Sequence, residues 1–317
     1  MPGHQPDHHP QVHRRRRTAH GDEPTETAPV SHVSSELHGA PSIGSAAAAA
    51  KRRRIAVCVD DFGLYPGIAT AAVHLAAHGR ISSVSCMTGA PAWQVGRPAL
   101  RQLQALGVEL GLHLDLSSHP LDARLRGSLP HWLFRAGTGT VDVNLLRREI
   151  QAQLERFEAM TGGAPDYVDG HQHLHQLPGV RTTLVDVLRE RYPGRLPWLR
   201  STRAAAAGAG HKARVIERLG NAGLSTLARR YGLAQNAHLL GVYDFSGEPD
   251  RYLTLLAGWL AGAGDGDLLV CHPSSDAAPG DPIGPARRRE FEVLRSAPFD
   301  RLLKDAGLSV VPLRDMA

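Results

Sequence analysis

The chain has 317 residues and a hydrophobic content of 42%, enough for a sizeable core in one large domain or two ordinary ones. No run approaches the ~18 uninterrupted apolar residues of a membrane span, so we expect a soluble protein without one. The formal net charge is +5, but eight Lys/Arg and five Asp/Glu place +3 of it in residues 1–54, and a near-neutral remainder argues against nucleic acid as the main partner.

Residues 1–50 are rich in Pro, His, Ser, Gly and Ala and show no hydrophobic periodicity, which predicts a disordered N-terminal arm. The arm holds seven of the eighteen histidines, but their scattered spacing does not favour a defined metal site. The basic run Arg14–Arg17 lacks the apolar segment that follows in an export signal. We therefore assign the fold to residues 51–317 as a single domain.

From Ile55 onward, strand-like and helix-like segments alternate at the spacing of βα units. The predicted strands begin at 55, 82, 108, 166, 196, 237, 267 and 308, and the predicted helices cover 66–77, 92–106, 145–160, 180–190, 251–260 and a stretch from 286. Two segments interrupt the alternation: a long irregular connection over 117–144, typical of a functional lid, and an Ala/Gly/Arg-rich helical insertion over about 202–235. Seven or eight such units predict an α/β fold, a (β/α) barrel that is distorted or seven-stranded.

The first strand ends abruptly in two acids, Asp60 and Asp61. In a strand, neighbouring side chains point to opposite sides, so one acid can bind a metal while the other accepts a proton. Two adjacent acids are costly to desolvate together, which favours a cation beside them. The alternative interpretation of Asp-Asp-Phe-Gly is a solvated turn.

The three cysteines, Cys58, Cys86 and Cys271, lie in apolar runs without Cys-x-x-Cys spacing. This pattern predicts small core residues in a reducing compartment, not disulfide or zinc-cluster partners. We therefore expect a cytoplasmic location.

Several polar residues fall at predicted C-terminal strand ends, where barrels collect their catalytic groups: Asp60, Asp61, His113, His171, Arg200 and His272. We assign Asp61, His113 and His171 to one divalent metal ion, because a set of three ligands leaves positions open for water and substrate. Asp60 is then the candidate general base, and His272 the candidate acid for the leaving amine. Arg200 is a candidate to hold a carboxylate ionised through bidentate pairing.

The segment His171-Gln172-His173-Leu174-His175 allows more than one interpretation. An extended chain places all three histidines on one side, whereas an α-helix pairs His171 with His175 only. We expect His173 and His175 to contact the substrate or support the metal ligands.

Asp115 and Asp169 are further acids near the predicted ligands, and we expect them to contact the substrate or to orient a histidine ring. His113 and His272 each have a structural alternative, as a hydrogen-bonded core residue and as a cap of its strand.

Five separated motifs carry a resemblance to a known family: Val59-Asp60-Asp61-Phe62-Gly63-Leu64, Gly79-Arg80-Ile81-Ser82-Ser83-Val84, Gly111-Leu112-His113-Leu114, Asp169-Gly170-His171-Gln172-His173-Leu174-His175 with Pro178, and Cys271-His272-Pro273. In order and spacing, across Arg54 to Leu313, they resemble the YdjC-like carbohydrate deacetylases, which are similar to the NodB-type polysaccharide deacetylases. The family's metal ligands fall on Asp61, His113 and His171, its proton acceptor on Asp60 and its late histidine on His272.

The resemblance implies a (β/α) barrel with a divalent metal that removes an N-acetyl group from an amino sugar in a small oligosaccharide. Family members tied to chitooligosaccharides and to hopanoid lipid biosynthesis share the motifs, so a glycolipid substrate stays open. Two histidines and one aspartate suit zinc, cobalt or nickel, whereas magnesium, which the resemblance also admits, prefers more oxygen ligands.

Two other classes of function remain open. One is a metal-dependent phosphoesterase or glycosidase on the same barrel, which the lack of a second carboxylate cluster for a paired metal makes weaker. The other is a non-catalytic sugar-binding protein. The oligomeric state also stays open, a homodimer included.

Overall fold

The computed structural model of the chain describes residues 52–206 and 208–316. The arm predicted over residues 1–50 lies outside the described residues. The segment Ala50–Ala317 forms one compact unit.

The strands of this unit belong to one parallel sheet and comprise β1 (Arg53–Phe62), β2 (Ser83–Cys86), β3 (Glu109–Leu114), β4 (Tyr167–Gly170), β5 (Trp198–Leu199), β6 (Leu239–Leu240), β7 (Asp267–Cys271) and β8 (Leu308–Val310). Seven of them follow the order β5-β4-β3-β2-β1-β7-β6, and β8 pairs with the first residues of β1. At the open edge, an isolated bridge joins Ala204, which follows β5, to Leu239 of β6, and no ladder of the described residues pairs β5 with β6. The sheet is therefore a distorted, incompletely closed (β/α) barrel of seven strands, as predicted.

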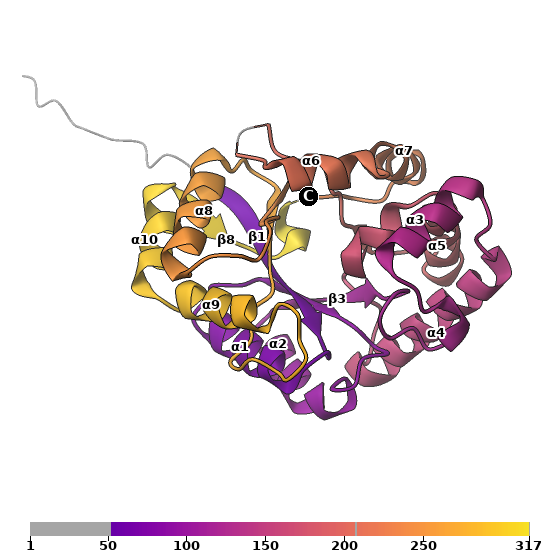
Figure 1. Cartoon of the computed structure of the whole chain (residues 1–317), viewed down its shortest axis with the longest axis horizontal. Helices are drawn as coiled ribbons and strands as arrows, with labels where there is room; N and C mark the ends of the chain where they lie inside the picture. The colour runs from indigo at the N-terminus through magenta and orange to yellow at the C-terminus, as the bar shows by residue number, and fades with distance from the viewer. Residues whose placement is uncertain (1–51, 207, 317) are drawn as a thin grey trace, which may run out of the picture. The chain divides into compact units, whose positions relative to one another are not determined.

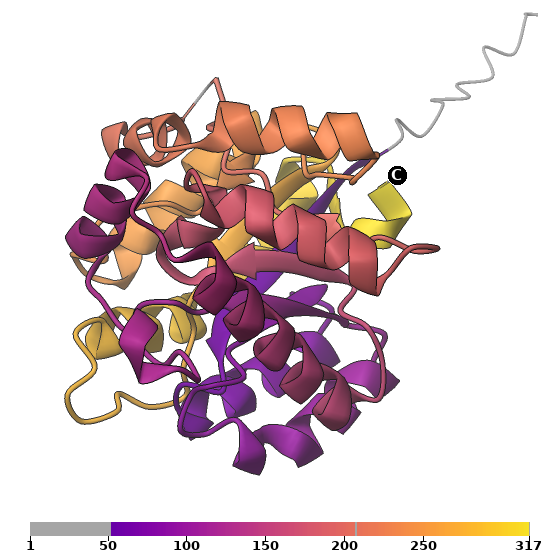
Figure 2. The same cartoon turned by 90° about the vertical axis from the view of Figure 1, so that its right-hand side faces the viewer.

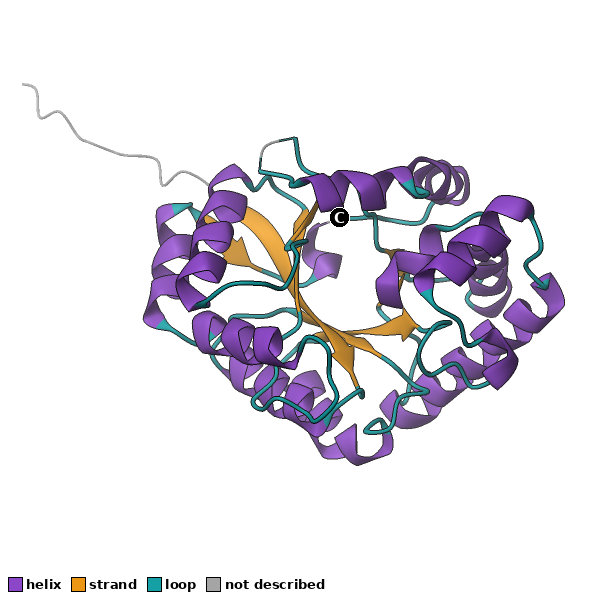
Figure 3. Cartoon of the chain, in the orientation of Figure 1, coloured by secondary structure: helices purple, strands orange, loops and turns teal. Residues whose placement is uncertain are grey.

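Helices surround these strands: α1 (Pro66–Ala77), α2 (Arg97–Ala105), α3 (Leu129–Thr138), α4 (Val143–Thr161), α5 (Val180–Arg191), α6 (His211–Arg218), α7 (Asn221–Tyr231), α8 (Pro249–Gly262), α9 (Gly284–Leu294) and α10 (Ala297–Asp305). Helices α1, α2, α4, α5 and α7 contact one another in that order, while α8 packs against α9 and α10 (Figures 1 and 3). In the view turned by 90°, helices again lie on both sides of the strands (Figure 2). Because all strands are parallel, their C-terminal ends meet on one side of this ring.

The connection over 117–144 is not irregular throughout, as the sequence had suggested, because it contains α3. Ser128 caps this helix by accepting a hydrogen bond from the His131 N–H, Pro130 lies in its first turn, and Gly139 closes it in the left-handed conformation at φ 70°. These are ordinary start and stop signals of a helix. The Trp132 indole is buried and donates to the Leu116 carbonyl oxygen at 2.9 Å, which ties α3 to the end of β3.

Two other predicted elements differ from the structure. The strand expected over 237–245 is only β6, because Gly241 adopts φ 91° and its backbone lies so close to Val270 that an added Cβ would meet the carbonyl oxygen at 2.1 Å. The single C-terminal helix is divided into α9 and α10, with Ser296 and Pro298 at the start of the second.

The structure of the described residues bears on the predictions about the cysteines and about membrane spans. Cys58, Cys86 and Cys271 are buried and form no disulfide, as expected. Among residues 52–206 and 208–316, none of the helices has the length and apolar character that a bilayer crossing requires.

Candidate active site

A cavity of about 770 Å³ lies at the C-terminal side of the strands. Six of the ten residues singled out in the sequence line it: Asp60, Asp61, His113, His171, His173 and His272. The other four, Asp115, Asp169, His175 and Arg200, are buried and lie outside its lining. The barrel thus brings together side chains from β1, β3, the segment after β4 and the segment after β7.

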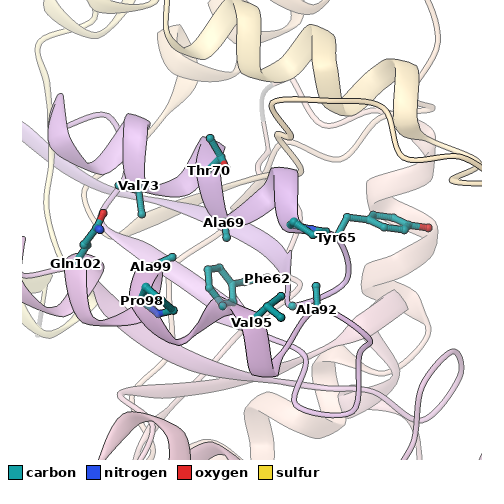
Figure 4. A pocket seen from close by; sticks show the side chains of 13 residues that line it. Phe62, Tyr65, Ala69, Thr70, Val73, Ala92, Val95, Pro98, Ala99 and Gln102 are labelled. Atoms are coloured by element: carbon teal, nitrogen blue, oxygen red, sulfur yellow. The ribbon is translucent and has the colours of Figure 1, made fainter.

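A second hollow, of about 450 Å³, lies between α1 and α2 (Figure 4). Its lining is mostly apolar, with Phe62, Ala69, Val73 and Ala99 among the labelled side chains, and none of its lining residues is charged. The titratable groups therefore point to the larger cavity as the candidate site.

The two acids of β1 reach the same cavity, although strand alternation predicts opposite sides. The register of β1 against β2 shifts between Val59 and Phe62, and Asp61 has a positive φ of 65°. Such a conformation is uncommon outside glycine, although aspartate tolerates it better than most residues. The bulge thus turns Asp61 toward the cavity next to Asp60, so the expectation of opposite sides was wrong.

Asp61, His113 and His171 converge on one point. The Asp61 Oδ1 atom lies 3.1 Å from His171 Nδ1 and 3.3 Å from His113 Nε2, and the three ligand atoms all lie within 4.8 Å of one another. Atoms bound tetrahedrally at about 2.0–2.1 Å from one zinc ion would be roughly 3.3 Å apart. The three side chains therefore fit a single divalent ion in both donor chemistry and spacing.

Asp169 fixes the ring of His113. Its Oδ1 accepts a hydrogen bond from His113 Nδ1 at 2.7 Å, which leaves Nε2 as the ring nitrogen that faces Asp61. A carboxylate behind the ring is the usual support of a metal-binding histidine. Burial would lower the pKa of His113, but Asp169, Asp60 and Asp61 raise it to about 10, so this position strongly favours positive charge.

Arg200 lies against Asp60 in a bidentate pair. Its Nη1 and Nη2 atoms donate to the two Asp60 oxygens, both at 2.7 Å, and Nη2 also lies 2.5 Å from Asp169 Oδ2. Burial would raise the pKa of Asp60, but the charge and hydrogen bonds of Arg200 hold it below its usual value. The pairing expected of Arg200 is present, and its partner is Asp60, whereas Asp61 is the aspartate that contacts His113 and His171.

The same guanidinium occupies the other cluster of potential ligands in the described residues, Cys58, Asp60 and Asp169. Arg200 Nη2 lies 3.2 Å from Cys58 Sγ and contacts both carboxylates. A cation already fills this cluster, so of the two ligand clusters in the described residues, the one around Asp61 is available to a metal ion.

His272 follows β7 and lines the cavity, where its ring meets Phe245 edge-on at 5.1 Å between centroids. Its backbone N–H donates to Glu290, a buried residue that also accepts a hydrogen bond from the Tyr243 hydroxyl at 2.7 Å. Within the protein, His272 Nδ1 has no hydrogen-bond partner. The backbone of His272 is thus held in place, while Nδ1 of its ring has no partner in the protein.

The His-rich segment is neither extended nor α-helical, so neither sequence interpretation of it was right. It forms a 3-10 segment, His171–Gln176, in which Gln172 and His173 have positive φ values of 52° and 59°. His173 therefore lines the cavity beside His171, and burial followed by the charges of His175 and Arg200 lowers its pKa well below the usual value. His175 turns inward, where its Nε2 lies 3.0 Å from the Arg200 carbonyl oxygen.

Asp115 organises the loop after β3. Its Oδ1 accepts hydrogen bonds from the backbone N–H groups of Ser117 and Ser118 at 2.8 and 3.0 Å, and the cavity is lined by Ser118 and His119. Its contacts are thus to the loop and not to a histidine ring.

Sequence reasoning missed several groups of the cavity. Arg287 of α9 donates to Asp61 Oδ2, and the insertion contributes residues of α6, among them Lys212 and Ile216. Arg287 is one of three consecutive arginines, Arg287–Arg289, and nothing in that run marks which of them faces β1. The helical character of the insertion was correctly predicted, but its position over the cavity was not.

Comparison with known proteins gives related sequences over most of the chain. This chain is 28% identical over 307 residues to a carbohydrate deacetylase of Homo sapiens, and the match covers 84% of this chain and 91% of that protein. It is 32% identical over 142 residues to a chitooligosaccharide deacetylase of Yersinia pestis (strain Pestoides F), a match of 43% of this chain to 55% of that protein.

Among solved structures, one from Enterococcus faecalis V583, named for a suggested cleavage of cellobiose phosphate, superposes with a TM-score of 0.63 at 17% identity. The match covers 84% of this chain and 99% of that one, and it supports the fold alone. The family model described as YdjC-like protein matches residues 54–305, which include every candidate site residue, and the chain therefore belongs to the YdjC-like protein family.

Proposed function

We propose that this protein is a metal-dependent carbohydrate deacetylase that hydrolyses the N-acetyl group of an amino sugar in a small oligosaccharide or glycolipid. The observation that carries the proposal is the convergence of Asp61, His113 and His171 on one point of a cavity that also contains Asp60 and His272. The names of the human and Yersinia relatives, a carbohydrate deacetylase and a chitooligosaccharide deacetylase, support the same reaction class.

Asp61, His113 and His171 would hold one divalent ion, and two imidazoles with one carboxylate favour zinc over magnesium. When bound there, the ion would lower the pKa of a water molecule and polarise the amide carbonyl. Asp169 keeps the His113 ring turned so that Nε2 faces this position.

Asp60 is the proposed general base. Arg200 keeps it ionised through its two hydrogen bonds, so a carboxylate oxygen is ready to take a proton from the attacking water. The water oxygen bonds to the acetyl carbon, the C–N bond breaks, and His272 gives a proton to the leaving nitrogen. The products are acetate and the free amino sugar.

The wall of the cavity supports a substrate larger than one acetyl group. An apolar part of the lining comprises Leu129 and Leu133 from α3, Val215 and Ile216 from α6, and Leu219 directly after α6. Because this wall is apolar, the proposed substrates include a glycolipid as well as a chitin fragment.

The proposal is tested by acetate release from N,N′-diacetylchitobiose before and after treatment with a chelator and re-addition of zinc. We expect Asp60→Asn to abolish turnover and keep metal binding, and Asp61→Asn to abolish turnover and bind metal much more weakly. Asp300→Asn, on α10, removes the partner of Arg80 and is the control that keeps both.

Three results would contradict the proposal: an Asp60→Asn variant that still turns over, wild-type protein that binds metal but releases no acetate from any N-acetylated sugar offered, or separated monosaccharides in the mass spectrum, which would indicate a glycosidase. We also propose that residues 51–317 are the catalytic domain, so a variant that lacks residues 1–50 should retain its activity.

A further inference from the structure

The two carboxylate oxygens of Asp61 have different partners. Oδ1 faces the two imidazoles, His171 Nδ1 at 3.1 Å and His113 Nε2 at 3.3 Å. Oδ2 accepts a hydrogen bond from Arg287 Nη2 at 2.7 Å. One oxygen thus points to the metal position, while the other is engaged on the opposite side.

Arg287 is itself held on both sides. Its Nε donates to Asp281 Oδ2 at 2.8 Å, and its side chain is 3% exposed. Its carbonyl oxygen accepts from the Ser274 N–H at 3.1 Å, which ties α9 to the segment after β7. A buried guanidinium between two carboxylates is fixed in direction, because any rotation would leave a buried charge without a partner.

The backbone of Asp61 makes this support important. Its φ of 65° follows the register shift at the end of β1, so regular strand pairing does not set the direction of its side chain. Apart from the two imidazoles that share the metal position, the hydrogen bond from Arg287 is a contact that can set it.

We propose that Arg287, anchored by Asp281, is a positioning residue that occupies Asp61 Oδ2 and leaves Oδ1 as the single carboxylate oxygen for the metal. The inference rests on the metal site proposed above and adds the way in which Asp61 takes part in it. Without Arg287 the carboxylate can turn and offer both oxygens or neither. Groups that orient metal ligands in this way typically contribute about 10–100-fold to metal affinity.

The experiment measures zinc affinity of chelator-treated full-length protein by calorimetric titration, without reference to turnover. We expect Arg287→Met to weaken zinc binding by about 10–100-fold. Arg287→Lys should cause a smaller loss because it keeps a cation beside the carboxylates, but it should not match the wild type, since one ammonium cannot hold both Asp61 and Asp281 as the guanidinium does. Arg288→Met, an exposed position in the same helix, is the matched control and should bind zinc as the wild type does.

Two further measurements separate positioning from a general effect on the fold. The visible absorption spectrum of the cobalt-substituted protein should change in Arg287→Met, because the coordination of Asp61 changes, and should stay unchanged in Arg288→Met. In an Asp61→Asn background, Arg287→Met should cause no additional loss of zinc affinity, since both act through one carboxylate.

The proposal is overturned if folded Arg287→Met and Arg287→Lys proteins bind zinc as tightly as the wild type, or if the losses of Asp61→Asn and Arg287→Met add. If Asp61→Asn binds zinc as well as the wild type, the metal site itself is wrong, and the proposed function fails first. Arg287→Lys keeps a cation between the carboxylates, so the test remains decisive where Arg287→Met does not fold.

Discussion

The Asp169→Asn variant should weaken metal binding, because it changes which ring nitrogen of His113 carries the proton. Asp169 is fully buried and accepts hydrogen bonds from His113 Nδ1 at 2.7 Å and from Ser85 Oγ at 2.6 Å, and it forms an ion pair with Arg200 Nη2 at 2.5 Å. An asparagine amide at this position has one accepting oxygen and one donating nitrogen.

The orientation of that amide follows from its neighbours. Arg200 can only donate, so the amide oxygen must face Arg200 and the amide nitrogen must face His113. His113 Nδ1 then has to accept, which moves the ring proton to Nε2, the atom 3.3 Å from Asp61 Oδ1. A protonated Nε2 cannot be a metal ligand.

We expect zinc affinity to fall by about 10–100-fold, which corresponds to roughly 1.4–2.7 kcal/mol. The unfolding free energy should also fall, by about 1–3 kcal/mol, because buried hydrogen bonds to a charged group are lost. Calorimetric zinc titration and urea unfolding measure the two effects separately.

The chain offers a matched control. Asp267, also buried, accepts a hydrogen bond from His238 Nδ1 at 2.8 Å, and neither residue lines the cavity. Asp267→Asn should lower stability and leave zinc affinity unchanged. Wild-type zinc affinity in Asp169→Asn, or an equal loss in Asp267→Asn, would refute the reasoning.

Three further predictions concern metal, packing and pH. Zinc at a hundred times its dissociation constant should stabilise the wild type by about 2.7 kcal/mol, seen as a higher melting temperature that Asp61→Asn does not show. Gly111→Ala should lower the urea-unfolding free energy by about 1–3 kcal/mol, because its Cβ would lie 2.3 Å from the Tyr167 ring, and an unchanged midpoint would contradict this. Hydrogen bonds from Arg191 lower the pKa of Glu158 in the folded protein. The contribution of Glu158 to the unfolding free energy is therefore present above its unfolded-state pKa of about 4.3 and is lost as the pH falls through its lower folded-state pKa. The stability difference between Glu158→Gln and wild type, at most about 1 kcal/mol near neutral pH, should therefore shrink in acid, as thermal melts across pH 3–7 would show.

Much of the barrel could be predicted because its signals are local. The bounds of α1, Pro66–Ala77, agree with the prediction, since Pro66 opens the helix and Gly79 follows its end. The convergence of Asp61, His113 and His171 could also be predicted, because parallel strands in a barrel end on the same side. That argument needs only the order of strands and a polar residue after each.

Other parts depend on contacts that no local pattern records. Helix α9 contains Arg287, Arg288 and Arg289 in succession, and only its rotation against β1 decides which one meets Asp61. Glu290, three residues after Arg287, is buried on a similar face, and that spacing was a weak signal for the orientation of the helix. By contrast, α3 did have readable signals in Ser128 and Gly139, so its omission was an error of interpretation.

The different roles proposed for Asp60 and Asp61 have a physical basis other than strand alternation. Both acids are buried in one cavity and are chemically identical, but two arginines make them unequal. Arg200 engages both oxygens of Asp60, which keeps that carboxylate ionised and away from a metal, whereas Arg287 engages only Oδ2 of Asp61 and leaves Oδ1 to the imidazoles. The number of oxygens that each arginine engages therefore determines which of the two acids can bind an ion.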